Sequence, residues 1–325
     1  MTTLRSTRIL AVLLTIAALL GACGSGTGAL GSVPPASTGP EPSVDLGSPD
    51  VTPSSEPTNE PSAEPSGPTA SPSASTAPTG TTIVRAYFWL GGAPGSAGLV
   101  AALRTVPGTK TVATAAMNAL LAGPTATESG DRMITSAVPV GSQLLGLTIK
   151  DGVATVDLSS EFESGGGSAS VLTRLGQVVY TLTQFPSVKS VLFLIEDQPA
   201  NVFSSQGIVL DKPVGRSDYV QLLPAIWVDR PAFNAAVGNP AHVTGSADVF
   251  EATFRISILD GTGKLLADQQ VMATCGSGCR GTFDVSIAYT ISKAQYGTLR
   301  VYDPSAKDGT PENVRDYRVW LTPKG

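Results

Sequence analysis

Residues 145–158 read LGLTIKDGVATVDL, and this stretch predicts a β-hairpin. Apolar residues alternate with polar or small residues on both sides of Asp151-Gly152, a dipeptide that is typical of two-residue hairpin turns. Side chains that alternate in this way lie on one face of each strand. The hairpin is therefore expected to bury one face within a layered domain.

A helix and a further strand are expected after the hairpin. Apolar residues at alternating steps of four and three predict the helix, and they are Val171, Leu175, Val178, Leu182 and Phe185. Ser168 or Ser170 can cap its start, and Pro186 stops it. The nearly continuous apolar run at 188–195 indicates a central strand that is covered on both faces.

The residues before the hairpin predict two more strands and another helix. Residues 83–90 and 99–106 have the composition of strands. Thr111 is a plausible N-cap for a helix, and Gly123-Pro124 ends it, because glycine adopts the left-handed conformation and proline cannot continue a helix. Strands interleaved with two helices indicate an α+β domain.

From Ala225 onward, helical periodicity gives way to short alternating strands. Apolar residues at every second position from Phe250 to Ile258 predict a strand with one wet side. Further strands are expected at 264–274, 281–288, 299–302 and 314–321, so this part is predicted to be an all-β sandwich. Residues 211–224 are rich in proline and glycine and are expected to form a hinge between the two parts.

The N-terminus has the layout of an export signal. Arg5 and Arg8 precede an apolar run at 9–20, and small residues lead to Cys23. The run is shorter than the roughly 20 residues that a membrane-spanning helix needs. Leu20-Gly21-Ala22-Cys23 resembles the lipobox of bacterial lipoproteins, which implies cleavage before Cys23 and a lipid on its sulfur. The alternative is a plain secretory peptide in which the cysteine occurs by chance.

Residues 24–82 predict a disordered linker. They consist mainly of Pro, Ser, Thr, Gly and Ala and contain no aromatic residue, so they cannot bury enough apolar surface to fold. Six acidic residues and no Lys or Arg lie there, and the chain's formal net charge is -5. The remaining folded part is therefore nearly neutral and has no basic stripe, which argues against a nucleic-acid partner.

Five blocks of the first folded part resemble a known family. They are Arg104–Val106, Ala119–Pro124, Ala137–Pro139, Asp151–Phe162 and Gln177–Thr183. Together they resemble the GerMN domain of sporulation and spore-germination lipoproteins. The resemblance implies a GerMN-like α+β fold and a place in the cell envelope.

The second folded part resembles the immunoglobulin-like domain that follows GerMN in bacterial germination-type proteins. The blocks that carry this resemblance are Val228–Pro231, Asn239-Pro240, Val243–Ala247, Val249–Ala252, Gly281–Phe283 and Val319–Pro323. Neither family has a catalytic site that can be transferred to this chain. The resemblances thus imply a protein that is not an enzyme and needs no cofactor.

Two motifs in the second part invite a chemical interpretation. Cys275 and Cys279 flank a short glycine-rich loop in an exported protein, where a disulfide is expected. A zinc site would lack two ligands, and the spacing differs from that of a redox pair. His242 is the only histidine, and without a nucleophile motif beside it we expect a structural residue at a strand edge.

Asp157, Ser159 and Glu161 alternate after the hairpin and form the candidate binding group. Two carboxylates at a strand end can serve a glycosidase or bind a cation. They can equally cap a nearby turn, because Asp and Ser accept hydrogen bonds from backbone N–H groups. Gly165-Gly166-Gly167 lacks the lysine and the spacing of a phosphate-binding loop and is expected to be flexible.

These observations divide the chain into a signal peptide at 1–22, lipidated Cys23 with its linker at 23–82, a GerMN-like domain at 83–212 and an immunoglobulin-like domain at 224–325. We expect a lipoprotein on the extracytoplasmic face of the cell membrane that acts as a binding or scaffold module. Its expected partners are the membrane, through the lipid, and peptidoglycan or another envelope protein. The alternatives are a cell-wall hydrolase that uses Asp157 and Glu161, and a lipid-anchored solute-binding component of a transporter.

Overall fold

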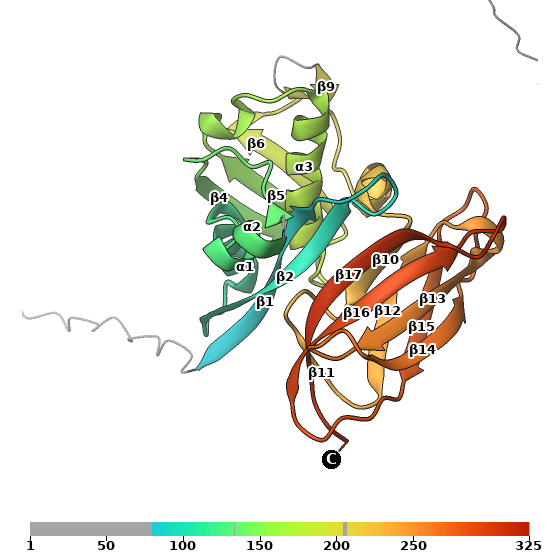
Figure 1. Ribbon diagram of the computed structural model, residues 1–325. Helices are drawn as coiled ribbons and strands as arrows, with labels where there is room; N and C mark the ends of the chain where they lie inside the picture. The colour runs from blue at the N-terminus through green and yellow to red at the C-terminus, as the bar shows by residue number, and fades with distance from the viewer. Residues whose placement is uncertain (1–79, 133, 204–206, 325) are drawn as a thin grey trace, which may run out of the picture. The chain divides into compact units, whose positions relative to one another are not determined.

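The computed structural model describes residues 80–132, 134–203 and 207–324, all of which belong to one compact unit, Ser71–Gly325. The predictions for the export signal, for Cys23 and for the linker up to residue 79 lie outside the described residues. Within the described part, none of the helices combines the length and the apolar character needed to cross a bilayer. An α+β region precedes an all-β region, as Figure 1 shows.

The predicted hairpin is present at the centre of the α+β region. One sheet holds, in this order, β4 (Leu144–Lys150), β5 (Val153–Leu158), β6 (Ser190–Ile195) and β7 (Gln198–Pro199). Asp151 and Gly152 have positive φ angles of 50° and 83°, as a tight hairpin turn requires. The alternate apolar residues of β5 are fully buried, whereas Leu145 and Ile149 on the outer strand β4 are 49% and 41% exposed.

Helix α3 (Ser168–Leu182) connects the parallel strands β5 and β6. The four stripe residues within it, Val171, Leu175, Val178 and Leu182, are fully buried. The predicted cap is wrong, because Gly167 and not Ser168 or Ser170 occupies the N-cap position. The prediction for β6 is also wrong in part: its burial alternates along the strand, so only one face is fully covered.

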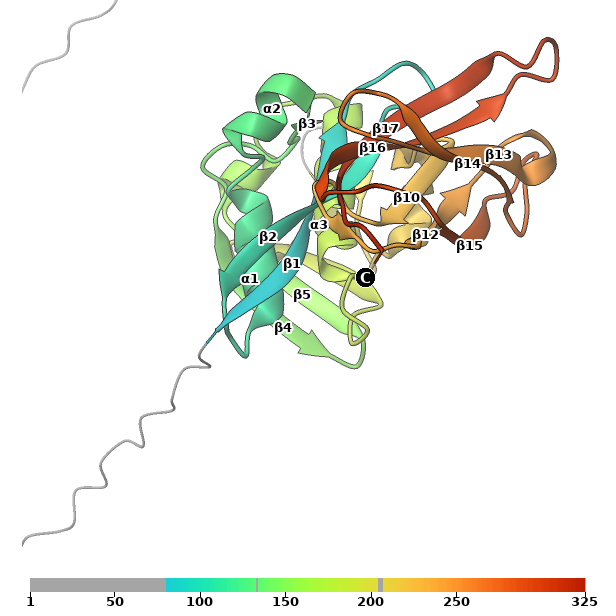
Figure 2. The same ribbon diagram turned by 60° about the horizontal axis from the view of Figure 1, so that its bottom comes forward.

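A second sheet packs on the other side of α3 (Figure 2). It contains β1 (Thr81–Leu90) between β2 (Gly98–Pro107) and β3 (Ile134–Thr135). Strand β1 therefore begins inside the stretch that we assigned to the linker. The helix expected after Thr111 is α1 (Val112–Leu121), although the Thr111 side chain makes no capping bond. Helix α2 (Ala126–Arg132) was not expected.

The connector between the two regions is packed, so the predicted hinge is wrong. After η1 (Ser160–Glu163) and the small pair β8 (Val202–Phe203) and β9 (Ile208–Val209), the chain forms the 3₁₀ segment η2 (Arg216–Leu222). Tyr219 and Leu222 of η2 are buried. Gly176 on α3 makes room for Leu222, because a Cβ atom at this glycine would lie 2.2 Å from the leucine Cδ1.

The all-β region is a sandwich of two sheets, as predicted. One sheet has the order β10 (Ile226–Arg230), β12 (Ala241–Ala247) and β15 (Gly281–Ile287). The other has the order β11 (Ala236–Val237), β17 (Pro311–Leu321), β16 (Gln295–Pro304), β13 (Thr253–Leu259) and β14 (Leu265–Met272).

The strand expected from Phe250 begins only at Thr253. Phe250–Ala252 form the turn η3, and Glu251 and Ala252 have positive φ angles of 54° and 57°. Residues with positive φ cannot continue a β-strand. As a result, Phe250 is 66% exposed and does not join the apolar face of β13.

Candidate ligand-binding cleft

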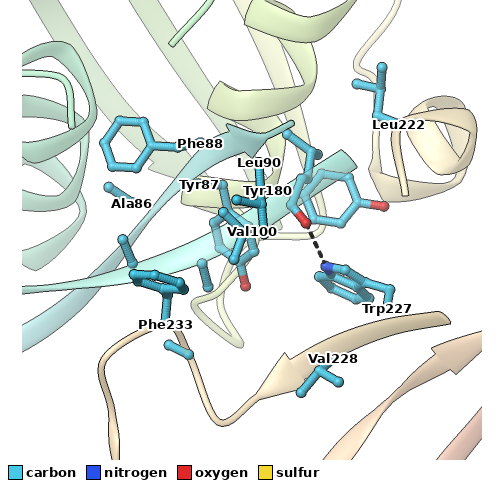
Figure 3. Packing of buried hydrophobic residues seen from close by; sticks show 14 of the residues in the cluster. Ala86, Tyr87, Phe88, Leu90, Val100, Tyr180, Leu222, Trp227, Val228 and Phe233 are labelled. Atoms are coloured by element: carbon cyan, nitrogen blue, oxygen red, sulfur yellow. Dashed lines mark hydrogen bonds between the residues drawn. The ribbon is translucent and has the colours of Figure 1, made fainter. Parts of the chain in front are cut away.

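Trp227, on β10, connects the two regions of the described unit. Its indole Nε1 donates a hydrogen bond to the carbonyl of Leu99 on β2 at 3.1 Å. Its ring meets the ring of Tyr180, on α3, edge-on with the centroids 5.6 Å apart. Figure 3 shows Tyr180 and Trp227 facing each other across the boundary between the two regions. Because the rings are buried and the N–H group has an acceptor, this contact holds β10 against the α+β region.

A polar network lies beside these rings. The hydroxyl of Tyr87, on β1, donates a hydrogen bond to Asp229 Oδ1 at 2.8 Å. Asp229 Oδ2 also lies 3.8 Å from a guanidinium nitrogen of Arg85. Burial and the neighbouring negative charge of Asp229 raise the pKa of Tyr87 to about 12. The tyrosine thus remains a hydrogen-bond donor, and the network ties β1 to β10.

Arg216, at the start of η2, stacks on the same aromatic cluster. The centre of its guanidinium group lies 4.7 Å from the ring centroid of Tyr180 and 5.6 Å from that of Tyr87. Its Nε donates a hydrogen bond to Thr183 Oγ1 at 2.8 Å. A planar guanidinium on aromatic faces is a favourable cation–π arrangement. The arginine is therefore held in place by neutral groups.

A cleft of about 700 Å³ opens next to Arg216. One wall is formed by η2 and the residue after it, and the other by β10, β12, β15 and the segment before β15. The residues that line the cleft are Tyr180, Arg216, Ser217, Val220, Leu223, Trp227, Asp229, Thr244, Gly245, Ser246, Thr274, Arg280, Thr282, Phe283 and Asp284. Both regions of the unit contribute, so the cleft exists only when they are joined.

Gly245, on β12, allows this wall to form. A Cβ atom at this position would lie 2.0 Å from the carbonyl oxygen of Trp227 and 2.7 Å from the ring of Phe283. Real Cβ atoms do not approach a backbone oxygen so closely. Any side chain at residue 245 would therefore push β10 and β12 apart.

Arg280 is the second arginine of the cleft. One of its terminal nitrogens donates to the carbonyl of Pro224 at 2.8 Å, and the other approaches the carbonyl of Ser246 at 3.3 Å. Burial lowers its pKa, and Asp248 acts on it in the opposite direction without forming an ion pair. Burial raises the pKa of Tyr180 to about 12, although Arg216 and Arg280 both act to lower it. The two cations thus act on the same tyrosine.

Asp157, Ser159 and Glu161 lie away from this cleft and have separate roles. Asp157 Oδ1 accepts a hydrogen bond from the backbone N–H of Asp197 at 3.0 Å. Ser159 Oγ accepts one from the N–H of Gln143 at 3.0 Å. The side chains of Asp157 and Ser159 are buried. These contacts favour turn capping over a role of the carboxylates in a glycosidase or in cation binding.

Glu161 is exposed. A hydrogen bond with Ser159 lowers its pKa below the usual range. The catalytic acid of a glycosidase needs a raised pKa, which is the opposite shift. Within the described residues, no group of three or more His, Cys, Asp or Glu side chains is placed to hold a metal ion.

Cys275, Cys279 and His242 lie next to residues that line the cleft. Cys275 and Cys279 are joined by a disulfide with their Cα atoms 5.8 Å apart, and the neighbouring Thr274 and Arg280 line the cleft. His242 Nε2 lies 2.6 Å from Asp284 Oδ1, and both side chains are exposed. His242 itself lines a separate cavity of about 560 Å³. Cys23 lies outside the described residues.

The glycine loop at 165–167 is organised by a buried arginine. Arg174, on α3, is 1% exposed and donates hydrogen bonds to the carbonyls of Phe162, Ser164 and Gly165 at 2.6–2.9 Å. The carbonyl groups of this loop therefore surround the guanidinium group of Arg174. This interaction explains the glycines at 165 and 166, whose φ angles are 62° and 80°.

Sequence reasoning missed the main cleft residues Trp227, Arg216 and Arg280. Trp227 directly precedes the block Val228–Pro231, which carried part of the family resemblance. Arg216 lies in the stretch that we predicted to be a hinge, and Arg280 directly follows Cys279. No local pattern indicates that these two arginines line the same cleft.

Each of the two regions matches the model of a known protein family. Residues 85–201 match the family model Germane, described as sporulation and spore germination. Residues 225–310 match Gmad2, the immunoglobulin-like domain of bacterial spore germination. The chain carries a Germane domain followed by a Gmad2 domain. Of the residues that line the cleft, Tyr180 lies in the first match, those from Trp227 to Asp284 lie in the second, and those from Arg216 to Leu223 lie in the connector between them. Among curated proteins no relative matches the chain.

Solved structures similar to the chain include domains of one sporulation protein. The first GerMN domain of GerM from Bacillus subtilis is 22% identical, with 42% of this chain and 99% of that one covered and a TM-score of 0.36. The tandem GerMN domains of the same protein are 16% identical, with 64% and 62% covered and a TM-score of 0.37. A predicted lipoprotein from Clostridium perfringens is 22% identical, with 44% and 93% covered and a TM-score of 0.31.

Proposed function

We propose that this protein is a non-enzymatic module of the cell envelope, held at the membrane by a lipid on Cys23, that binds a partner in the cleft between its Germane and Gmad2 domains. The observation that carries the proposal is the cleft itself, because one wall is the connector segment η2 together with Tyr180 of the Germane domain and the other wall comes from the Gmad2 domain. The two spore-germination domain matches and the lipobox-like Leu20–Cys23 support the envelope setting.

The contacts at the junction support a binding role. Trp227, Tyr87 and Arg216 hold the walls through buried hydrogen bonds and ring contacts. A site that is formed before its ligand arrives loses less conformational freedom on binding. We therefore expect the cleft to bind without a large rearrangement of the two domains, with peptidoglycan or another envelope protein as the partner.

Site-specific photocrosslinking in cells tests the binding role. Val220 is 44% exposed on the cleft wall, so a benzophenone amino acid at this position of the full chain faces a bound partner. Val140 is fully exposed outside the cleft and provides the matched control. We expect a discrete crosslinked species from residue 220 and none from residue 140. Identical patterns from both positions would contradict the proposal.

Fatty-acid labelling tests the anchor. The full chain, expressed in a bacterial host with an alkyne fatty acid, is expected to take up the label and to fractionate with membranes. Cys23→Ser is expected to lose both properties, because a covalent lipid needs the cysteine sulfur. A wild-type chain that stays unlabelled and soluble would overturn the lipid anchor.

A further inference from the structure

The positive charges of the cleft are not neutralised by carboxylates at contact distance. Arg216 donates to Thr183 Oγ1 and to the carbonyl of Tyr180, and Arg280 donates to the carbonyls of Pro224 and Ser246. Within the described residues, neither arginine forms an ion pair. Guanidinium groups held by neutral acceptors retain their attraction for an anion.

The two aspartates of the cleft are engaged elsewhere. Asp229 accepts the hydrogen bond of Tyr87 and lies 3.8 Å from Arg85. Asp284 pairs with His242 at 2.6 Å. The Tyr87 hydroxyl lies between Asp229 and Arg216, since it donates to the carboxylate and accepts from the guanidinium at 3.5 Å, and in the described part of the chain neither aspartate forms an ion pair with Arg216 or Arg280. Their negative charges still oppose a doubly charged ligand more than a singly charged one.

The rest of the cleft offers apolar surface. Val220 is 44% exposed on η2, Leu223 is half-buried, and the largely buried Trp227 and Phe283 line the opposite wall. A ligand that fills about 700 Å³ therefore meets both a cationic pair and an apolar wall. Ligand sites commonly combine apolar walls with a few polar groups that fix the orientation.

We propose that the cleft binds a carboxylate carried on an apolar group, with Arg216 and Arg280 holding the carboxylate and Val220 and Leu223 contacting the apolar part. This assignment rests on the proposed function and names the chemistry of its ligand. A single negative charge suits a cleft that also contains two aspartates, which favours a carboxylate over a phosphate. A chain end with an apolar terminal residue and a free apolar acid both provide this chemistry.

Calorimetric titration with small probes tests the assignment. The protein is the chain from residue 23 onward with Cys23→Ser, which keeps the linker and both domains. The probes are N-acetylphenylalanine, its amide, phenyl phosphate, and N-acetyl-Ala-Ala-Phe with a free carboxylate. We expect N-acetylphenylalanine to bind at least tenfold more tightly than its amide, because charge-assisted hydrogen bonds to a carboxylate are lost in the amide. Tighter binding of the peptide than of the single residue identifies a chain end as the source, and equal binding identifies a free acid.

Variants of the arginines locate the site. Arg280→Gln and Arg216→Gln are each expected to weaken the binding of N-acetylphenylalanine by roughly tenfold and to leave the binding of its amide unchanged. Arg300→Gln is the matched control, because Arg300 pairs with Asp316 on the surface outside the cleft, and it is expected to change nothing. Since Arg216 also stacks at the junction, thermal melting accompanies each titration. If Arg216→Gln unfolds, the comparison of Arg280→Gln with the charge-preserving Arg280→Lys tests whether a positive charge at residue 280 holds the acid in the cleft.

Three outcomes would overturn the assignment. They are equal affinity for acid and amide, absence of binding by every probe, and tighter binding of phenyl phosphate than of the carboxylate. If any of them occurs while the crosslink from residue 220 persists, the cleft binds a partner of different chemistry and the proposed function stands. Loss of the crosslink together with binding of the acid would instead show a small-molecule site that has no envelope partner.

Discussion

Arg315, on β17 of the all-β region, donates a hydrogen bond to the carbonyl of Ser96 in the loop between β1 and β2 of the α+β region. Its second terminal nitrogen donates to the carbonyl of Leu99 at 3.0 Å, the same oxygen that accepts the Trp227 indole N–H. Arg315 is only 3% exposed, and burial lowers its pKa. Backbone dipoles of one domain thus stabilise a buried cation of the other.

Arg315→Met is expected to separate the unfolding of the two domains. The variant leaves the Ser96 carbonyl without its donor, and we expect the free energy of unfolding to fall by about 3 kcal/mol. Scanning calorimetry should show one transition for the wild-type chain and two for the variant. Arg300→Met, which removes an exposed ion pair from β16, should cost less than about 1 kcal/mol. Equal effects of the two substitutions would contradict the role of Arg315.

Alkaline pH is expected to destabilise the junction. Burial raises the pKa of Tyr87 and of Tyr180 to about 12, whereas an unfolded tyrosine titrates near pH 10. The unfolded state therefore loses these protons first, and the stabilisation, complete below pH 10, is lost as the pH rises to 12. Each tyrosine should lower the free energy of unfolding by about 1.4 kcal/mol per pH unit in this interval.

Tyr87→Phe isolates one of these contributions. Urea denaturation between pH 8 and 12 should show a slope that is smaller by about 1.4 kcal/mol per pH unit above pH 10, because one titrating group is absent. The variant also loses the hydrogen bond to Asp229, which lowers its stability at every pH. A slope identical to that of the wild-type chain would show that Tyr87 does not titrate with unfolding.

Local periodicity predicted the secondary structure well where the whole pattern lies within one helix or one hairpin. The stripe from Val171 to Leu182 and the alternation around Asp151-Gly152 need only neighbours in the chain, and both occur in the structure. The turn at Phe250 was missed because its apolar alternation is compatible with a strand, and only the positive φ angles of Glu251 and Ala252 interrupt it.

The cleft could not be predicted from local patterns. Arg216 lies in the connector and Arg280 in the Gmad2 domain, and they line one cleft because Trp227 and Tyr87 fix β10 against the Germane domain. Proline and glycine at 213–215 indicate a break in regular structure, but they do not show whether the next residues pack. Leu222 packs because Gly176 leaves room for it on α3, and this pairing depends on the tertiary fold.

Removing the disulfide is expected to loosen the turn at Glu251. Closing the short loop between Cys275 and Cys279 contributes about 2 kcal/mol on the chain-entropy model, so the double variant Cys275→Ser/Cys279→Ser should lose roughly this amount. The N–H of Glu251 bonds to Ser277 Oγ within the loop at 2.9 Å, so its hydrogen exchange should accelerate. Reduction of the wild-type chain should reproduce both effects and leave the double variant unchanged. Exchange that is insensitive to reduction would contradict this prediction.

Substitutions at Asp157 and Glu161 distinguish a structural pair from a hydrolytic one. Asp157→Ala removes the acceptor of the Asp197 N–H and should lower the free energy of unfolding by about 1–2 kcal/mol. Glu161→Gln should leave it essentially unchanged, because this side chain is exposed. Hydrogen bonding from Ser159 lowers the pKa of Glu161, so the carboxyl group is a poor proton donor at neutral pH. We therefore expect no release of soluble fragments from purified cell wall by the wild-type chain or by either variant. Cell-wall cleavage that disappears in Glu161→Gln would instead assign the protein to the hydrolases, because only the carboxyl group differs between the two chains.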